Sequence, residues 1–113
     1  MAPHEDMDEP AVTVLGAVAV SLGPDESTVV LTGDIDLAME SALGEACSAV
    51  LERGVPVRID ARGATFIDSR GVAALLPLIR GRAGGRRPVF VGAPRLVLDI
   101  IVMMGLGDLL ELA

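Results

Sequence analysis

The segment Asp68-Ser69-Arg70-Gly71 places a carboxylate, a hydroxyl and a cation side by side between two apolar runs. Ser69 allows three chemical interpretations: a nucleophile, a helix N-cap or an acceptor of phosphate. A nucleophilic serine needs a base within hydrogen-bond reach. The one histidine, His4, lies in the acidic N-terminal segment, and Asp68, as the immediate neighbour of Ser69, is poorly placed to remove its proton. We therefore do not expect a hydrolase.

Other enzymatic chemistries also lack the residues that they need. Phosphorylation of Asp60, as in response-regulator receivers, would require an acidic pair after the first strand and a lysine to hold metal and phosphoryl oxygens. The chain contains no lysine. It also has no metal-ligand spacing and no glycine-rich phosphate loop. We expect no catalytic residue, no metal and no cofactor, and hence no enzyme.

The cap and phosphate-acceptor interpretations of Ser69 both stay open on the residues alone. A serine at the start of a helix can accept a hydrogen bond from a free backbone N–H, and the same N–H groups would stabilise a phosphate. A phosphate would add roughly −1.5 to −2 charges close to the carboxylates of Asp36 and Asp68, which would repel it. Composition alone favours the cap.

The patterns around these residues predict the elements that position them. Apolar stripes with helical spacing predict three helices, one from its N-cap Asp36 to Gly54, one after Gly71 that Gly84 and Gly85 close, and one from Pro94 to Gly105. Pro77 conflicts with the second helix, because a proline two turns into a helix removes a hydrogen bond and should kink the chain.

Apolar and β-branched runs predict strands at residues 11–22, 28–33, 57–60, 88–93 and 108–112. The first two should form a hairpin, and residues 64–67 either extend the third strand or connect it to Asp68. The uncharged run 88–93 is typical of a strand in a sheet that is covered on both faces. Strands that alternate with helices predict an α/β fold with a mixed sheet.

Charge is distributed unevenly along the 113 residues, whose net charge is −7. Residues 1–52 hold eleven acids and no base, whereas residues 53–113 hold nine arginines and five acids. This acidity argues against direct nucleic-acid binding, since phosphates would be repelled. The basic cluster formed by Arg80, Arg82, Arg86 and Arg87 is interpreted as cations that complement the end of a helix.

We expect residues 1–10 to form a disordered acidic tail and residues 11–113 to form a single domain. The longest uncharged stretch, residues 11–24, is too short to cross a bilayer, and the acidic N-terminus does not resemble a secretory signal. These features predict a cytoplasmic protein without membrane insertion. Cys47, the only cysteine, is expected to be a small core hydrophobe.

Three segments, in this order and spacing, resemble the STAS domain of bacterial anti-sigma-factor antagonists. They are residues 29–43 (VVLTGDIDLAMESAL), 57–76 (VRIDARGATFIDSRGVAALL) and 95–112 (RLVLDIIVMMGLGDLLEL), and the most specific parts are GDID, DSRG and MGLGDLL. The resemblance covers nearly all of the chain beyond residue 11. It implies an α/β, STAS-like mixed β-sheet of four to five strands packed with three to four helices, and a protein that works by binding.

In such antagonists the dephosphorylated form binds an anti-sigma factor with serine kinase activity and so frees a sigma factor. The kinase phosphorylates the serine that follows the aspartate, and a serine phosphatase reverses the reaction. On this chain the resemblance makes Ser69 the phosphorylated residue, and it implies a partner-binding surface of Asp34, Asp36, Asp68, Ser69, Arg70 and Gly71. ATP and its metal would belong to the partner.

The chain departs from the family pattern at two positions. Arg70 stands where the family has a second hydroxyl, and Pro77 interrupts the helix behind Ser69. The same domain type also occurs as a scaffold of stress-signalling complexes and as a regulatory subunit of an ATP-driven lipid-transport complex, both without a phosphorylation cycle. These alternatives and the oligomeric state stay open on the sequence.

Overall fold

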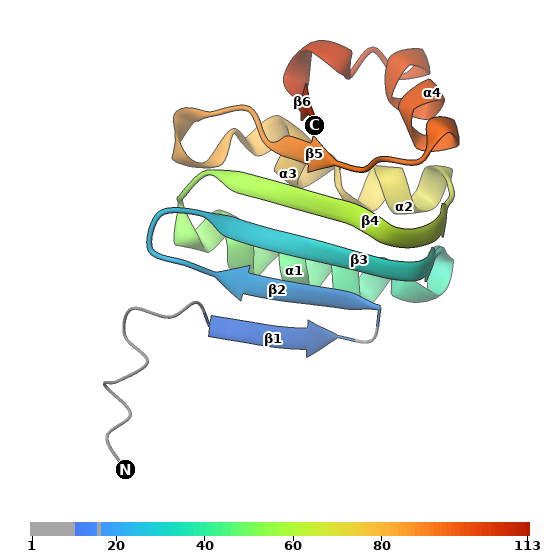
Figure 1. The fold of residues 1–113 in the computed structure, drawn as a ribbon. Coiled ribbons are helices and arrows are strands. Elements are labelled where there is room, and N and C mark those ends of the chain that lie inside the picture. The colour runs from blue at the N-terminus through green and yellow to red at the C-terminus, as the bar shows by residue number, and fades with distance from the viewer. Residues whose placement is uncertain (1–10, 16) are drawn as a thin grey trace.

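The computed structural model describes residues 11–15 and 17–113, so the expected acidic tail at residues 1–10 lies outside the described residues. The described chain forms one six-stranded sheet in the order β1-β2-β3-β4-β5-β6 (Figure 1). The strands are β1 Ala11–Leu15, β2 Val18–Leu22, β3 Ser27–Ile35, β4 Val57–Ile67, β5 Val89–Val91 and β6 Glu111–Leu112. The first three strands pair antiparallel and the remaining pairs are parallel. The predicted α/β fold with a mixed sheet is confirmed.

The predicted first strand, residues 11–22, is a hairpin in its own right. Leu15 pairs with Val18 at the end of β1 and β2, and Leu22 pairs with Ser27 where β2 passes into β3. The prediction of one long strand was wrong because a tight connection needs only about two residues, and small apolar residues continue through it. The sheet therefore gains one antiparallel strand at its edge.

Within residues 17–113, four α-helices and three 3₁₀ turns join the strands. The helices are α1 Glu40–Arg53, α2 Ser69–Ala74, α3 Leu76–Gly81 and α4 Arg95–Met103, and the turns are η2 Leu37–Met39, η3 Ala83–Gly85 and η4 Gly107–Leu109. The predicted stop at Gly54 is confirmed, because Gly54 ends α1 in the left-handed conformation with φ 71°. Pro94 immediately precedes α4, as expected.

Pro77 breaks the second helix in two. Leu75 separates α2 from α3, and Pro77 lies in the first turn of α3, where its missing N–H is not needed. The backbone N–H groups of Leu78 and Ile79 both donate to the carbonyl of Leu75, at 3.0 and 3.1 Å. The kink expected from the sequence is thus present. The predicted end of this helix at Gly84 and Gly85 was wrong, because Arg82 already ends α3 in a left-handed conformation.

The helices α1, α2 and α3 lie against one face of the sheet (Figure 1). In β4 the side chains of Val57, Ile59 and Ala61 are buried, whereas those that alternate with them are partly exposed. In β5 only Phe90 is buried, and Val89 and Val91 are half-buried. The prediction that residues 88–93 are covered on both faces was therefore wrong. The absence of charge in a strand does not by itself indicate a second layer of helices.

Cys47 on α1 belongs to the core, which confirms the sequence prediction. Its thiol donates to the carbonyl oxygen of Ala74 at 3.4 Å, and burial raises the pKa of Cys47 to about 11. At pH 8 a thiol of this pKa is ionised in about one molecule in a thousand. Because the thiolate is the reactive form, the native protein should protect this side chain.

We expect Cys47 of the folded protein to react with a disulfide reagent at pH 8 at least one hundredfold more slowly than in denaturant. The measurement is the rate of thiolate release from Ellman's reagent, with glutathione in each buffer as the control for reagent reactivity. Similar rates for the folded and unfolded chains would contradict the burial of this thiol.

Candidate functional site

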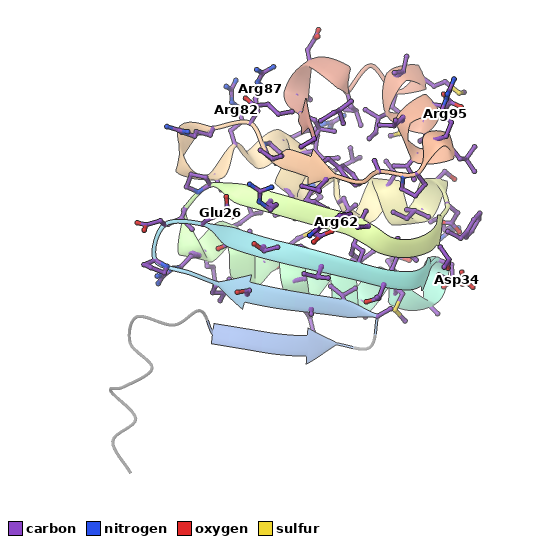
Figure 2. The ribbon with its side chains drawn as sticks, in the orientation of Figure 1. Glu26, Asp34, Arg62, Arg82, Arg87 and Arg95 are labelled. Carbon is purple, nitrogen blue, oxygen red and sulfur yellow. The ribbon has the colours of Figure 1, made fainter. Side chains whose placement is uncertain are left out.

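The segments that contain Asp36 and Asp68 emerge side by side from the sheet. Strands β3 and β4 are parallel, and Ile35 pairs with Ile67 at their ends. The backbone N–H of Asp68 donates to the carbonyl oxygen of Ile35 at 3.3 Å. The carboxyl ends of the two strands thus bring the GDID and DSRG segments together, and Figure 2 shows Asp34 at this edge of the molecule.

Asp68 is the N-cap of α2. Its Oδ1 accepts a hydrogen bond from the backbone N–H of Gly71 at 2.8 Å, and its carbonyl oxygen accepts one from Val72 at 3.1 Å. The interpretation of Ser69 as the cap was therefore wrong by one residue. Aspartate and serine are both favoured at this position, so propensity alone does not choose between them.

Ser69 is the first residue of α2 and is exposed. Its hydroxyl forms no hydrogen bond with any residue in the described part of the chain. The folded protein therefore does not use this hydroxyl to hold α2 in place.

Asp36 caps a 3₁₀ turn and not α1. Its Oδ1 accepts from the backbone N–H of Ala38 at 3.0 Å, and its carbonyl oxygen accepts from Met39 at 2.9 Å. The predicted capping of α1 was wrong because η2 intervenes, and α1 begins at Glu40 without a side-chain cap. The half-buried Asp36 still lies immediately beyond β3.

Asp34 is held by a residue that sequence reasoning missed. The hydroxyl of Thr65 donates to Asp34 Oδ1 at 2.8 Å, which connects exposed side chains on β3 and β4. The register between these strands shifts twice, between Val30 and Thr32 and between Gly33 and Asp34. The sequence pattern contains no signal for such shifts, so the Asp34–Thr65 contact was not predictable from it.

Arg70 faces α1 across an open hollow of about 540 Å³ that is lined by Glu40, Gly44, Arg70, Ala73 and Ala74. Its Nη1 lies 4.0 Å from Glu40 Oε2, and both side chains are mostly exposed. An exposed pair at this distance contributes at most about 1 kcal/mol. Arg70 can therefore exchange this acid for another anion at small cost.

Gly71 is buried, and it contributes to the site by allowing α2 to lie close to β3. A Cβ on this residue would lie 2.8 Å from the carbonyl oxygen of Ile35 and 2.9 Å from Cγ2 of Ile67. The first turn of α2 therefore packs directly on the end of β3, which only glycine permits.

Asp60, the alternative phosphate acceptor, is placed differently. It lies within β4, not at its end, and both of its carboxylate oxygens are bound by the guanidinium of Arg62 at 3.0 and 2.8 Å. This hydrogen-bonded pair holds the pKa of Asp60 below its usual value. Arg62 lies at the middle of the sheet in Figure 2. Asp60 is thus not one of the residues that meet beyond β3 and β4.

Among residues 11–15 and 17–113, no group of three or more histidine, cysteine, aspartate or glutamate side chains is arranged to hold a metal ion. None of the helices in these ranges has the length and apolar character needed to cross a membrane.

Comparison with known proteins identifies similar sequences and folds. A family model described as "Mlab, STAS domain" matches residues 18–111. A search of curated proteins finds no match.

Solved structures with the same fold include an anti-sigma factor antagonist from Mycobacterium paratuberculosis, with a TM-score of 0.68, 24% identity and coverage of 98% of this chain and 87% of that chain. The anti-sigma factor antagonist SpoIIAA in its unphosphorylated form has a TM-score of 0.64 and 18% identity, and the match covers 92% of this chain and 87% of the SpoIIAA chain. The Bacillus cell fate determinant SpoIIAA in its phosphorylated form has a TM-score of 0.63 and 17% identity, and the match covers 92% of this chain and 90% of that chain. At these identities the structures support the fold.

The packing of Gly71 leads to a stability prediction. Gly71→Ala should lower the free energy of unfolding by about 2 kcal/mol, because its new methyl group would clash with the end of β3. Gly44→Ala is the matched control, since beyond the neighbouring backbone of α1 no atom lies within 4 Å of a Cβ at that exposed position. It should raise the free energy of unfolding by about 0.5 to 1 kcal/mol. Urea denaturation measures both, and equal effects of the two substitutions would contradict the close contact.

Proposed function

The chain belongs to the STAS-domain family, and from that premise we propose that it is an anti-sigma factor antagonist controlled by phosphorylation of Ser69. In its dephosphorylated form it binds an anti-sigma factor with serine kinase activity in the cytoplasm, and a sigma factor is released. The kinase phosphorylates Ser69 and ends the interaction, and a serine phosphatase restores it. In this mechanism the chain is the substrate of the kinase and of the phosphatase, which supply the catalytic groups.

The observation that carries this proposal is the separation of two roles between Asp68 and Ser69. Asp68 makes the hydrogen bond that starts α2, whereas the adjacent Ser69 is exposed and its hydroxyl forms no hydrogen bond with the described residues. A kinase can therefore reach Ser69, and a phosphate on its oxygen removes no hydrogen bond that the fold uses.

Charge gives the switch its direction. Asp34, Asp36 and Asp68 lie at the same edge of the sheet as Ser69. A phosphate adds roughly −1.5 to −2 charges beside them. The phosphate is repelled by these carboxylates and by the nucleotide phosphates that a kinase partner holds, and its bulk separates the two surfaces. A loss of about 3 kcal/mol would lower the affinity more than one hundredfold.

Arg70 modifies this electrostatic balance. Its ion pair with Glu40 is long and exposed, and a phosphate on the preceding residue is a stronger partner for a guanidinium. We infer that phosphorylation draws Arg70 away from Glu40 and so rearranges the hollow between α1 and α2 as well as adding charge.

The same Arg70 favours a second candidate function. It replaces the second hydroxyl of the family pattern, and a long cation beside the acceptor can exclude a kinase that recognises the usual motif. In this alternative the chain is a scaffold or regulatory subunit of a stress-signalling complex or of an ATP-driven lipid-transport complex, and Ser69 contacts the partner without a phosphorylation cycle.

Phosphorylation is tested with the cognate anti-sigma kinase and ATP. The intact mass of the wild-type chain should increase by one phosphate, and Ser69→Ala should abolish the increase. Ser48→Ala, at an exposed serine on α1, is the control and should be phosphorylated like the wild type. Phosphate that persists in Ser69→Ala would refute Ser69 as the acceptor, and no phosphate on any form would favour the alternative without a cycle.

Binding to the anti-sigma factor tests the effect of charge. Ser69→Glu should weaken the affinity at least tenfold more than Ser69→Gln, which has a similar size but no charge. Ser48→Glu adds the same charge on α1 and should leave the affinity within twofold of the wild type. Isothermal titration calorimetry measures each variant, and equal affinities of Ser69→Glu and Ser69→Gln would refute the charge switch.

A further inference from the structure

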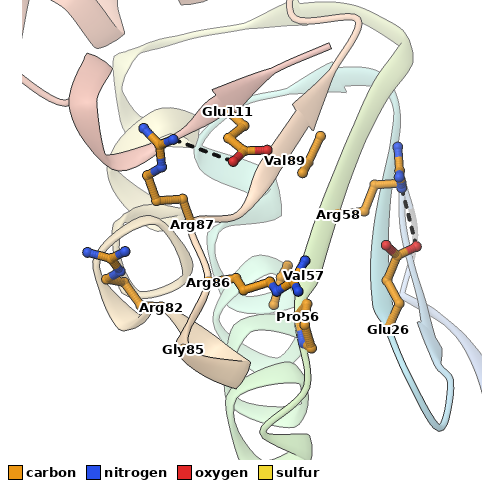
Figure 3. Close-up of a pocket in the computed structure, with 10 residues that line it drawn as sticks. All are labelled: Glu26, Pro56, Val57, Arg58, Arg82, Gly85, Arg86, Arg87, Val89 and Glu111. Atoms are coloured by element: carbon orange, nitrogen blue, oxygen red, sulfur yellow. Dashed lines mark hydrogen bonds and ion pairs between the residues drawn. The ribbon is translucent and has the colours of Figure 1, made fainter.

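A second hollow lies at the opposite edge of the sheet from Ser69, where β3, β4 and β5 begin (Figure 3). It has a volume of about 460 Å³ and is lined by Glu26, Pro56, Val57, Arg58, Arg82, Gly85, Arg86, Arg87, Val89 and Glu111. We call it the arginine pocket. Its four arginines come from β4 and from the connection between α3 and β5.

The arginines of this pocket are unequally paired. Arg58 contacts Glu26 at 3.3 Å and Arg87 contacts Glu111 at 3.5 Å. Side chains are described for residues 17–113 except Leu37, and among them Arg82 and Arg86 form no ion pair. The four arginines and two glutamates leave the lining with two net positive charges, on a chain whose net charge is −7.

The earlier interpretation of these arginines applies to only part of the cluster. Arg80 lies in the last turn of α3, where a cation complements the helix end as expected. Arg82, Arg86 and Arg87 line the pocket instead. Figure 3 shows Arg82 and Arg87 on one side of the pocket, Arg58 and Glu26 on the other, and Arg86 between them.

The backbone holds this connection in a conformation that arginine disfavours. Arg82 has φ 46° and ψ 48°, and it is the one residue other than glycine with a positive φ among the described residues. Gly84 packs so closely on Pro56 that a Cβ would lie 2.5 Å from the proline Cδ. The N–H of Gly85 donates to the carbonyl of Arg82 at 2.8 Å. Strain of this kind often accompanies ligand sites, because the surrounding structure must maintain it.

We propose that the arginine pocket binds a small molecule that carries a phosphate or diphosphate group. Planar guanidinium groups match the oxygens of phosphate, and two net positive charges balance a phosphate dianion. The volume lies within the range of small-molecule sites, and Pro56, Val57 and Val89 provide an apolar wall for the rest of the ligand. The overall acidity of the chain argues against a nucleic acid in this position.

An acidic peptide fits the pocket less well. Glu26 and Glu111 line it beside Arg58 and Arg87, and they would repel a row of carboxylates that crosses the pocket. Arg82 and Arg86 form no ion pair among the described residues, so a compact phosphate that binds them need not displace either glutamate from its arginine. The arginine pocket does not depend on the role proposed for Ser69. The eleven residues of β4 separate the pocket at the start of the strand from Ser69 beyond its end by roughly 30 Å.

The experiment titrates the full chain with pyrophosphate and with inorganic phosphate at constant ionic strength, by calorimetry and by amide shifts in NMR. Pyrophosphate should bind one to one, and the shifts should be confined to residues 56–58, 82–89 and 111. Arg82→Gln combined with Arg86→Gln should weaken pyrophosphate binding at least tenfold. Arg80→Gln is the matched control, an exposed arginine outside the pocket, and should change the affinity less than twofold.

A second variant guards against a folding artefact. Arg82→Gly suits the left-handed backbone, so it removes the guanidinium without adding strain and should also weaken pyrophosphate binding. Absence of saturable binding at millimolar pyrophosphate would overturn the proposal. An equal loss in Arg80→Gln would do the same, because it would indicate adventitious ion binding only. Tighter binding of a hexaglutamate peptide than of pyrophosphate would overturn the assigned ligand class.

Discussion

The first turn of α2 rests on the carbonyl oxygen of Ile35, and the geometry of the candidate site depends on this contact. The same oxygen accepts the backbone N–H of Asp68 and lies where any side chain on residue 71 would be. This one carbonyl oxygen therefore fixes the position of Asp68, where β4 ends, and the distance between α2 and β3. Asp36 follows directly from the same residue, so the two acidic segments beside Ser69 are positioned by one point at the end of β3.

This contact also decides which residue caps α2. With Gly71 held against β3, the carboxylate of Asp68 reaches the free N–H of Gly71, and the exposed Ser69 is not needed as the cap. If Ser69 were the cap, modification of its oxygen would remove a hydrogen bond worth about 1 kcal/mol to the helix. In the proposed switch, a cap one residue earlier allows a phosphate to be added at Ser69 without the loss of this hydrogen bond.

Local sterics made part of the fold predictable from sequence. Gly54 ends α1 and Pro77 divides the second helix because these residue types restrict or permit particular backbone angles. The predictions failed where distant partners decide the outcome. Register shifts between β3 and β4 bring Thr65 to Asp34. The turn that divides residues 11–22 into β1 and β2 was missed for a local reason, because small apolar residues continue through it. The GDID and DSRG segments were predicted to form one surface, and the parallel ends of β3 and β4 do bring them together. The cap of α2 was not predictable, because it depends on the contact with the carbonyl of Ile35, which the spacing of apolar residues does not reveal.

The parallel strands also separate two regions of opposite charge. Asp34, Asp36 and Asp68 lie at the carboxyl ends, and the arginine pocket lies at the amino ends. At physiological ionic strength the Debye length is about 8 Å, far shorter than the roughly 30 Å along β4. The field of a phosphate at either end is therefore screened before it reaches the other. Any coupling between the two ends would have to be mechanical, through β4, whose buried residues pack against the helices and resist displacement. The arrangement thus allows one domain to bind at both ends of its sheet with little electrostatic interference between them.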